Sequence, residues 1–317
     1  MAKSRKPLVS ERSAIASGKK RAAEAVGRRK AAVAPRLAAV ARAQKADVAK
    51  GKTLASIAGV TPIVAMAQSV GTLIAEGDSW FDYPFVDVLK SLDDRHGFEI
   101  ESVAHRGDSV EAMAYNGQLD DFSRRIEKVL RRGVVPRAIL LSGGGNDVAG
   151  DQFQMLLNHS LSPTRGLNER VVEGIIDDRV RLAYVTILSA ITALCESLAN
   201  ATIPILLHGY DYPVPDGRGF WGGWWFLPGP WLKPGFDLKG YGDLKENIGI
   251  CKDLIDRLNT MIRSVTALPQ FSHVKFIDLR GTLSNRPSDY EDWWDNEMHP
   301  TRKGFEAVAD QFAAEIP

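Results

Sequence analysis

The sequence predicts an α/β protein built on a flavodoxin-like, doubly wound parallel sheet of five strands. Two observations support this fold class. Short apolar runs bounded by Gly, Pro or polar residues recur along the chain, as β-strands do. Segments with a helical pattern lie between these runs, and strand–helix alternation is typical of a parallel sheet with helices on both faces. We therefore expect right-handed crossovers between the strands.

The predicted elements follow in chain order. We expect strands at 72–76, 99–104, 137–142, 203–207 and 274–278. We expect helices at about 84–94, 108–132, 170–200 and 243–267, and a last helix after Pro300. In open parallel sheets, ligands bind at the carboxyl ends of the strands. Polar residues just after these strands are therefore the first candidates for a functional site.

The composition is that of a globular protein, with 44% hydrophobic and 25% charged residues, and 317 residues can bury a large core. No run of 18 or more consecutive apolar residues occurs, so we expect no membrane span. Cys195 and Cys251 fall in predicted helices, and their number and spacing suggest neither a disulfide framework nor a zinc site. We expect both to be small buried apolar residues.

The charge is unevenly distributed. Residues 1–52 hold 15 Lys/Arg and 3 Asp/Glu, whereas the remainder holds 25 and 36. We interpret 1–52 as a basic arm, partly helical and partly disordered, because alanine favours helix and Pro35 interrupts it. The arm either adds only solubility or contacts an anionic surface without sequence preference. It contains no aromatic residue for base stacking, so we expect no specific nucleic-acid binding.

Residues 53–70 are mildly apolar and are interpreted as a short linker helix that leads into a domain at 71–317. The sequence Ala65-Met66-Ala67 also fits an export signal with cleavage near Ala67. Gly59 and Pro62 break the apolar run, and the basic part is longer than that of an ordinary signal. We expect a cytoplasmic protein and keep export as the alternative.

A serine stands just past the first predicted strand, in Gly77-Asp78-Ser79. A serine hydroxyl becomes a useful nucleophile when a base removes its proton and donors stabilise the oxyanion that follows. Gly107 and Asn146 follow the second and third strands, and His299 lies in the loop after the fifth. All of them should meet at one edge of the sheet, although they are spread over 220 residues.

These residues resemble the motif blocks of the SGNH/GDSL hydrolases, a family of serine esterases, lipases and acetylesterases. The blocks are Gly77-Asp78-Ser79, Ala104 to Ser109 around Gly107, Gly144-Gly145-Asn146-Asp147, and His299-Pro300 with Thr301 and Gly304. The resemblance covers roughly residues 70–317 and implies the flavodoxin-like fold. It implies that Ser79 is the nucleophile and His299 the general base. The oxyanion hole would comprise the Ser79 and Gly107 backbone N–H groups and the Asn146 amide, with no metal or cofactor.

The third triad residue departs from the family pattern. The family has Asp three residues before its histidine, whereas this chain has Asn296 there. An amide can orient the imidazole but cannot offset its positive charge, and the acid normally does both. We therefore predict Asp295 as the acid. Asp292 is the second choice, and a Ser–His dyad helped by a backbone carbonyl is the third.

The stretch 209–243 is rich in Gly, Pro and aromatic residues, and we expect a long loop without regular structure. Since it follows the fourth strand, it should form a wall of an apolar substrate pocket or a satellite core cluster. Candidate substrate contacts are His105, His208, Tyr210, Trp221, Trp224 and Trp225.

The sequence thus predicts a metal-independent serine esterase that acts on a small ester or an acylated polymer. A carbohydrate O-acetylesterase with the same mechanism is the first alternative. A catalytically degenerate binding module anchored by the basic arm is the second.

Overall fold

The computed structural model describes residues 6–49, 69–220 and 228–317. Its sheet consists of β1 (Gly71–Glu76), β2 (Phe98–Ser102), β3 (Ala138–Leu141), β4 (Ile205–His208) and β5 (Val274–Ile277). The strand order is β2-β1-β3-β4-β5, and every neighbouring pair is parallel. This is the flavodoxin-like order, so the predicted fold class is confirmed.

The central strands are apolar because helices cover both faces of the sheet. β3 and β4 are buried along their whole length, and in their register Ile139 pairs with Ile205 and Leu141 with Leu207. A strand buried on both faces reads as a continuous apolar run rather than an alternating one. The carboxyl ends of β1, β3 and β4 therefore emerge together at one edge.

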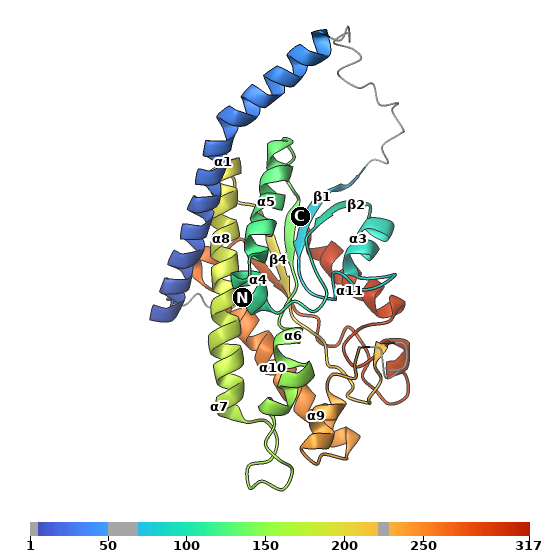
Figure 1. Ribbon diagram of the computed structural model, residues 1–317. Coiled ribbons are helices and arrows are strands. Elements are labelled where there is room, and N and C mark those ends of the chain that lie inside the picture. The colour runs from blue at the N-terminus through green and yellow to red at the C-terminus, as the bar shows by residue number, and fades with distance from the viewer. Residues whose placement is uncertain (1–5, 50–68, 221–227) are drawn as a thin grey trace.

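Helices cover the sheet in two layers (Figure 1). One layer pairs α3 (Val88–His96) with α11 (Arg302–Glu315). The other contains α4 (Val110–Tyr115), α5 (Gln118–Arg131), α8 (Arg181–Ala199) and α10 (Leu244–Thr266). The helix expected at 108–132 is two helices, because the chain turns at Gly117 with φ of 92°.

Short segments complete the chain around the sheet. They are α6 (Gly145–Val148), η1 (Gly150–Leu156), α7 (Glu169–Val172), a π-helical segment η2 (Glu173–Val180), α9 (Lys233–Leu238), η4 (Pro269–Phe271) and η5 (Tyr290–Asp292). The helix α9 lies in the stretch that we expected to have no regular structure. Pro234 stands in its first turn, where the missing N–H has no helical partner to lose. Proline there starts a helix rather than preventing one.

The helix α1 (Val9–Ala49) forms a third layer on the outer side of α8 (Figure 1). Ala14, Gly18 and Ala22 are buried against it. A Cβ atom at Gly18 would lie 2.4 Å from the backbone oxygen of Thr186, so glycine permits this close approach. The expected interruption at Pro35 does not occur, since the helix continues through it to Ala49. The later part of α1 extends beyond the other elements (Figure 1).

The position of α8 between α1 and the sheet explains its composition. By length and apolar composition alone, one helical stretch among the described residues, Glu169–Ala199, could cross a membrane. Most of its apolar window is buried inside the fold, as in the core helix of a globular protein. A helix that is covered on both sides becomes apolar around most of its circumference.

Cys195 and Cys251 are free and buried, as expected. Burial raises the pKa of the Cys195 thiol to about 12, so it stays protonated near neutral pH. The predicted linker helix and the Ala67 cleavage site lie almost entirely outside the described residues.

Candidate active site

The turn after β1 places Ser79 at the edge of the sheet. Gly77 is necessary there, because a Cβ atom would lie 2.7 Å from Ser142 Cβ and 2.9 Å from the Phe81 ring. The buried Asp78 carboxylate then accepts a hydrogen bond from the Trp80 backbone N–H at 3.0 Å. This turn leaves Ser79 half-buried at the floor of a pocket.

Ser79, His299 and Asn296 form a hydrogen-bonded row. Ser79 Oγ lies 2.8 Å from His299 Nε2, and His299 Nδ1 lies 2.9 Å from Asn296 Oδ1. Since an amide oxygen only accepts hydrogen bonds, Nδ1 carries the imidazole proton. Nε2 is then free to accept the Ser79 proton, which is the arrangement that a serine nucleophile requires.

The His299 imidazole is packed between aromatic rings. The Tyr83 ring stacks on it with 4.3 Å between centroids, and the Trp231 ring meets it edge-on at 5.2 Å. Only 6% of His299 is exposed. Burial lowers the pKa of the imidazole to about 3, so the ring is neutral in ordinary buffers.

The structure does not bring Asp295 to the imidazole. We expected its carboxylate to contact Nδ1, but Asn296 occupies that place. Asp295 Oδ2 instead accepts hydrogen bonds from the Tyr83 hydroxyl at 3.0 Å and the Asn296 amide at 3.2 Å. Asp292 is exposed, and its backbone oxygen accepts from Thr301. The contact with His299 Nδ1 is thus made by Asn296, three positions before the histidine.

Three donors expected in the oxyanion hole line the same pocket. Among the described residues, no hydrogen bond from the Ser79 or Gly107 backbone N–H to a protein acceptor occurs. Asn146 Nδ2 donates one hydrogen to the Asp108 carbonyl at 2.9 Å, and a second remains on the same nitrogen. Gly107 has φ of 88°, and a Cβ atom there would point into open space.

The pocket over Ser79 has a volume of about 430 Å³. Its lining is mainly apolar and comprises Ser79, Tyr83, Pro84, Arg106, Gly107, Asn146, Phe220, Pro228, Trp231 and His299. Sequence reasoning missed Tyr83, Phe220 and Trp231 as individual wall residues. The aromatic density of 209–243 indicated the wall, and Tyr83 stands four residues after Ser79, where a turn can return a side chain to the serine.

Other predicted substrate contacts lie elsewhere. His208 is fully buried and Tyr210 is nearly so, and neither lines the pocket over Ser79. His105 is exposed and lies 3.7 Å from Asp108, outside this pocket. Residues at the end of a parallel strand can point into the core as readily as toward a ligand, which is what His208 does. Trp221, Trp224 and Trp225 lie outside the described residues.

A second serine, histidine and aspartate are joined beneath the site. The Ser142 hydroxyl lies 2.7 Å from His208 Nε2 and 2.8 Å from Asp78 Oδ1, and the Tyr210 hydroxyl donates to Asp78 Oδ2. Here the serine stands between the histidine and the acid, and Ser142 and His208 are fully buried. Ser142 lines neither the pocket over Ser79 nor the cavity next to Trp80 and Met298. This network therefore braces the turn that carries Ser79.

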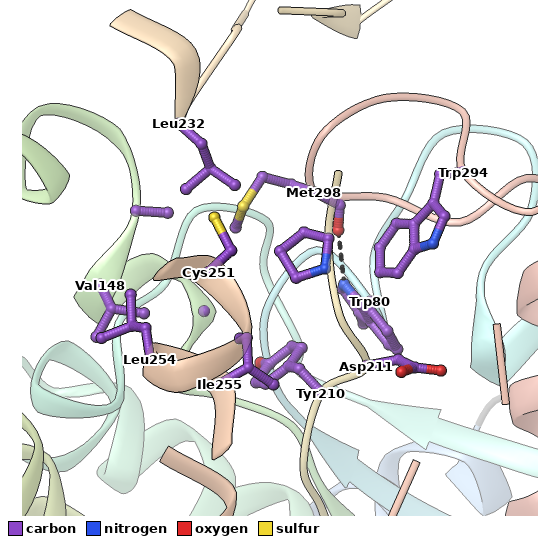
Figure 2. Close-up of a pocket in the computed structure, with 13 residues that line it drawn as sticks. Trp80, Val148, Tyr210, Asp211, Leu232, Cys251, Leu254, Ile255, Trp294 and Met298 are labelled. Atoms are coloured by element: carbon purple, nitrogen blue, oxygen red, sulfur yellow. Dashed lines mark hydrogen bonds between the residues drawn. The ribbon is translucent and has the colours of Figure 1, made fainter. Parts of the chain in front are cut away.

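Figure 2 shows the residues that line a small apolar cavity. The volume of this cavity is about 30 Å³. Trp80 and Met298 stand at its wall, and Trp80 Nε1 donates to the Met298 carbonyl at 3.0 Å. This bond ties the Ser79 turn to the His299 loop. No residue lines both this cavity and the pocket over Ser79.

The aspartates near the site are engaged by protein groups. Asp82 accepts from the Arg106 backbone N–H, and Asp147 from the Val110 backbone N–H. Burial raises the pKa of Asp147 to about 6. Among the residues that the structure describes, no group of three or more His, Cys, Asp or Glu is arranged to hold a metal ion.

Comparison with solved structures finds distant neighbours. A lipase from a goat rumen metagenome is 15% identical with a TM-score of 0.43, and the alignment covers 77% of this chain and 96% of that chain. A member of the lipolytic G-D-S-L family from Veillonella parvula is also 15% identical, with a TM-score of 0.40 and coverage of 77% and 97%. No curated protein matches the chain.

A family model matches residues 71–307, which include the Ser79 turn, the Gly107 and Asn146 loops and the His299 loop. The resemblance seen in the sequence blocks is thereby confirmed, and the chain belongs to the GDSL-like lipase/acylhydrolase family.

Proposed function

We propose that the protein hydrolyses carboxylic esters through an acyl-enzyme on Ser79. The observation that carries this proposal is the 2.8 Å contact between Ser79 Oγ and the neutral, buried His299 imidazole. A serine placed on an imidazole whose far nitrogen is protonated is ready to lose its own proton. The donor groups of Gly107 and Asn146 on the same pocket support the same chemistry.

The reaction follows from the roles of these groups. Ser79 Oγ attacks the ester carbonyl as His299 Nε2 takes the hydroxyl proton. The Ser79 and Gly107 backbone N–H groups and the Asn146 amide stabilise the tetrahedral oxyanion. The leaving alkoxide receives the proton from His299, and water, deprotonated by the same imidazole, then hydrolyses the acyl-enzyme.

The pocket lining supports an acyl or aryl ester as substrate. Phe220, Pro228 and Trp231 supply an apolar wall, and the pocket volume of about 430 Å³ admits a small to medium acyl group. A carbohydrate O-acetylesterase of the same mechanism is the second candidate, because flat rings such as Trp231 also stack on sugars. The neutral imidazole aligned on the serine argues against a binding module, which needs no such base.

The test is turnover of p-nitrophenyl acetate, butyrate and octanoate by the full chain and by Ser79→Ala, beside acetylated xylan. We expect Ser79→Ala to lose turnover and labelling by a fluorophosphonate while it keeps the wild-type melting temperature. Ser142→Ala is the matched control and should still be labelled. Turnover retained by Ser79→Ala would remove Ser79 as nucleophile.

A further inference from the structure

We propose that Tyr83 and Asp295 are positioning residues that hold the Asn296 amide in the one orientation that makes His299 a base. This proposal rests on the proposed function, in which His299 accepts the Ser79 proton. In a Ser–His–Asp triad, a negatively charged carboxylate contacts the imidazole. In this chain the Asn296 amide makes that contact, and the Asp295 carboxylate lies on the far side of the amide. Asn296 therefore has to be oriented by other groups.

The oxygen end of the Asn296 amide faces donors only. Oδ1 accepts hydrogen bonds from the Met298 and His299 backbone N–H groups, each at 3.0 Å, and from His299 Nδ1 at 2.9 Å. Asn296 is completely buried, so water does not compete for these bonds. An amide nitrogen in this place would face two backbone N–H groups and lose both bonds.

The nitrogen end of the amide faces acceptors. Asn296 Nδ2 donates to the Tyr83 hydroxyl oxygen at 2.9 Å and to Asp295 Oδ2 at 3.2 Å. The Tyr83 hydroxyl in turn donates to Asp295 Oδ2 at 3.0 Å. Burial, aided by the nearby Asp295, raises the pKa of Tyr83, which keeps the phenol protonated as this triangle requires. Asp295 Oδ2 therefore accepts both bonds.

Orientation of the amide decides the tautomer of the imidazole. A reversed amide would present N–H to His299 Nδ1 and force the imidazole proton onto Nε2, which could no longer accept the Ser79 proton. The wrong tautomer costs about 10⁴ in rate in a serine protease triad. Tyr83 also stacks on the imidazole, so one side chain sets both the ring plane and the amide beside it.

Charge around the imidazole also follows from this arrangement. The titratable or charged groups near it are Tyr83, Asp295 beyond the amide, and Arg106 on the pocket wall. Glu297, on the same loop, accepts backbone N–H groups at 217 and 231–233 instead. Burial lowers the pKa of the imidazole to about 3, and no carboxylate among the described residues touches the ring to raise it. The acid limb of activity should therefore lie near that pH.

The experiment compares pH profiles of kcat and KM for p-nitrophenyl butyrate. We expect Asp295→Asn and Tyr83→Phe each to lower kcat by about tenfold to a hundredfold, the range for a lost hydrogen bond to a charged group, with KM little changed. Asn296→Asp places an anion on Nδ1 and should move the acid limb upward by about 1–3 pH units. Asp292→Asn, which removes an exposed acid of the same segment, is the control and should leave the profile unchanged.

A second measurement does not depend on turnover. The ¹⁵N shifts of the His299 ring should report the Nδ1–H tautomer in the wild type and loss of that single tautomer in the Tyr83→Phe/Asp295→Asn double variant. Unchanged kcat in Asp295→Asn and Tyr83→Phe, with Ser79-dependent turnover intact, would overturn the proposal alone. Absence of Ser79-dependent turnover would overturn the proposed function, and an unchanged tautomer in the double variant would then also overturn the proposal.

Discussion

Glu297 Oε2 lies 2.6 Å from the Trp231 backbone nitrogen, and this hydrogen bond joins the His299 loop to the wall of the substrate pocket. The same carboxylate accepts from the backbone N–H groups of Leu232, Lys233 and Gly217. Glu297 is completely buried, so these backbone donors take the place of the water that would solvate an exposed carboxylate. The wall and the base are therefore held by one side chain that touches neither substrate nor imidazole through its own carboxylate.

Glu297→Gln should loosen the wall. The amide nitrogen of glutamine would face backbone donors, so we expect a loss of about 1–3 kcal/mol in the free energy of unfolding. KM for p-nitrophenyl octanoate should rise more than KM for the acetate, because a longer acyl chain makes more contact with the wall that contains Trp231 and Phe220. Urea denaturation and steady-state kinetics measure the two effects. Glu291→Gln, which changes an exposed residue nearby, is the control. An equal fall of kcat on all esters would place the effect on His299 instead.

Loss of the Asn146 amide should remove a transition-state contact. Asn146→Ala is expected to lower kcat by about 10²–10³ with KM nearly unchanged, as for other single oxyanion donors. Kinetics on p-nitrophenyl butyrate check this. An Asn146→Ala variant whose KM rises while kcat is preserved would show that the amide binds ground-state substrate only.

Gly107→Ala should lower both stability and activity because of the backbone conformation at this position. At φ of 88° a side chain costs about 1–2 kcal/mol per residue, although the methyl group itself meets no atom. We expect a lower melting temperature and a shifted backbone N–H, hence a lower kcat. Gly117→Ala, at φ of 92° with equally open space, is the control. It should lower the melting temperature alike but keep kcat, and equal kcat losses in the two variants would contradict the role of Gly107.

Two glycines of α1 provide a matched pair for the contact with α8. Gly18→Ala places a methyl group 2.4 Å from the Thr186 oxygen and should destabilise the protein by about 1–3 kcal/mol. Gly27→Ala meets no atom and should stabilise the helix by about 1 kcal/mol. Thermal melts of the two variants measure the difference. Equal effects would mean that α1 does not pack on α8 in solution.

Glu76 should make stability depend on pH. Burial raises the pKa of its carboxyl from the ordinary 4.5 to about 9. A folded pKa above the unfolded value gives stability that is complete below pH 4.5 and is lost as pH rises through 9. Glu76→Gln, which can still accept the Gly77 N–H, should equal the wild type at pH 5 and exceed it at pH 9. Urea titrations at both values measure this, with the exposed Asp93→Asn as control. A difference that is constant with pH would contradict it.

Much of the fold could be predicted because the strands are short apolar runs with clear boundaries. β1 and β5 begin and end within one residue of the expected bounds, and β3 within one at each end. The Ser79, Gly107, Asn146 and His299 positions follow from the same reasoning, since parallel strands bring their carboxyl ends together. The spacing also identified position 296, but the preference for a charged acid led us to Asp295.

Contacts between distant segments could not be predicted in the same way. The packing of α1 on α8 depends on Gly18 and two alanines, which carry no strong hydrophobic signal in a basic sequence. The burial of His208 depends on Ser142 and Asp78, which lie 66 and 130 residues away in the chain. Such pairings arise from packing in three dimensions, and a single sequence does not display them.

The layer formed by α1 bears on where the protein can be shortened. A fragment starting near residue 70 keeps every group around Ser79. It nevertheless exposes to solvent the flank of α8 that contains Thr186, Ser189 and Ala190. We expect such a fragment to self-associate through that flank, because removal of α1 exposes surface that the full chain buries. The helix α1 thus acts as an intramolecular cover for one side of α8.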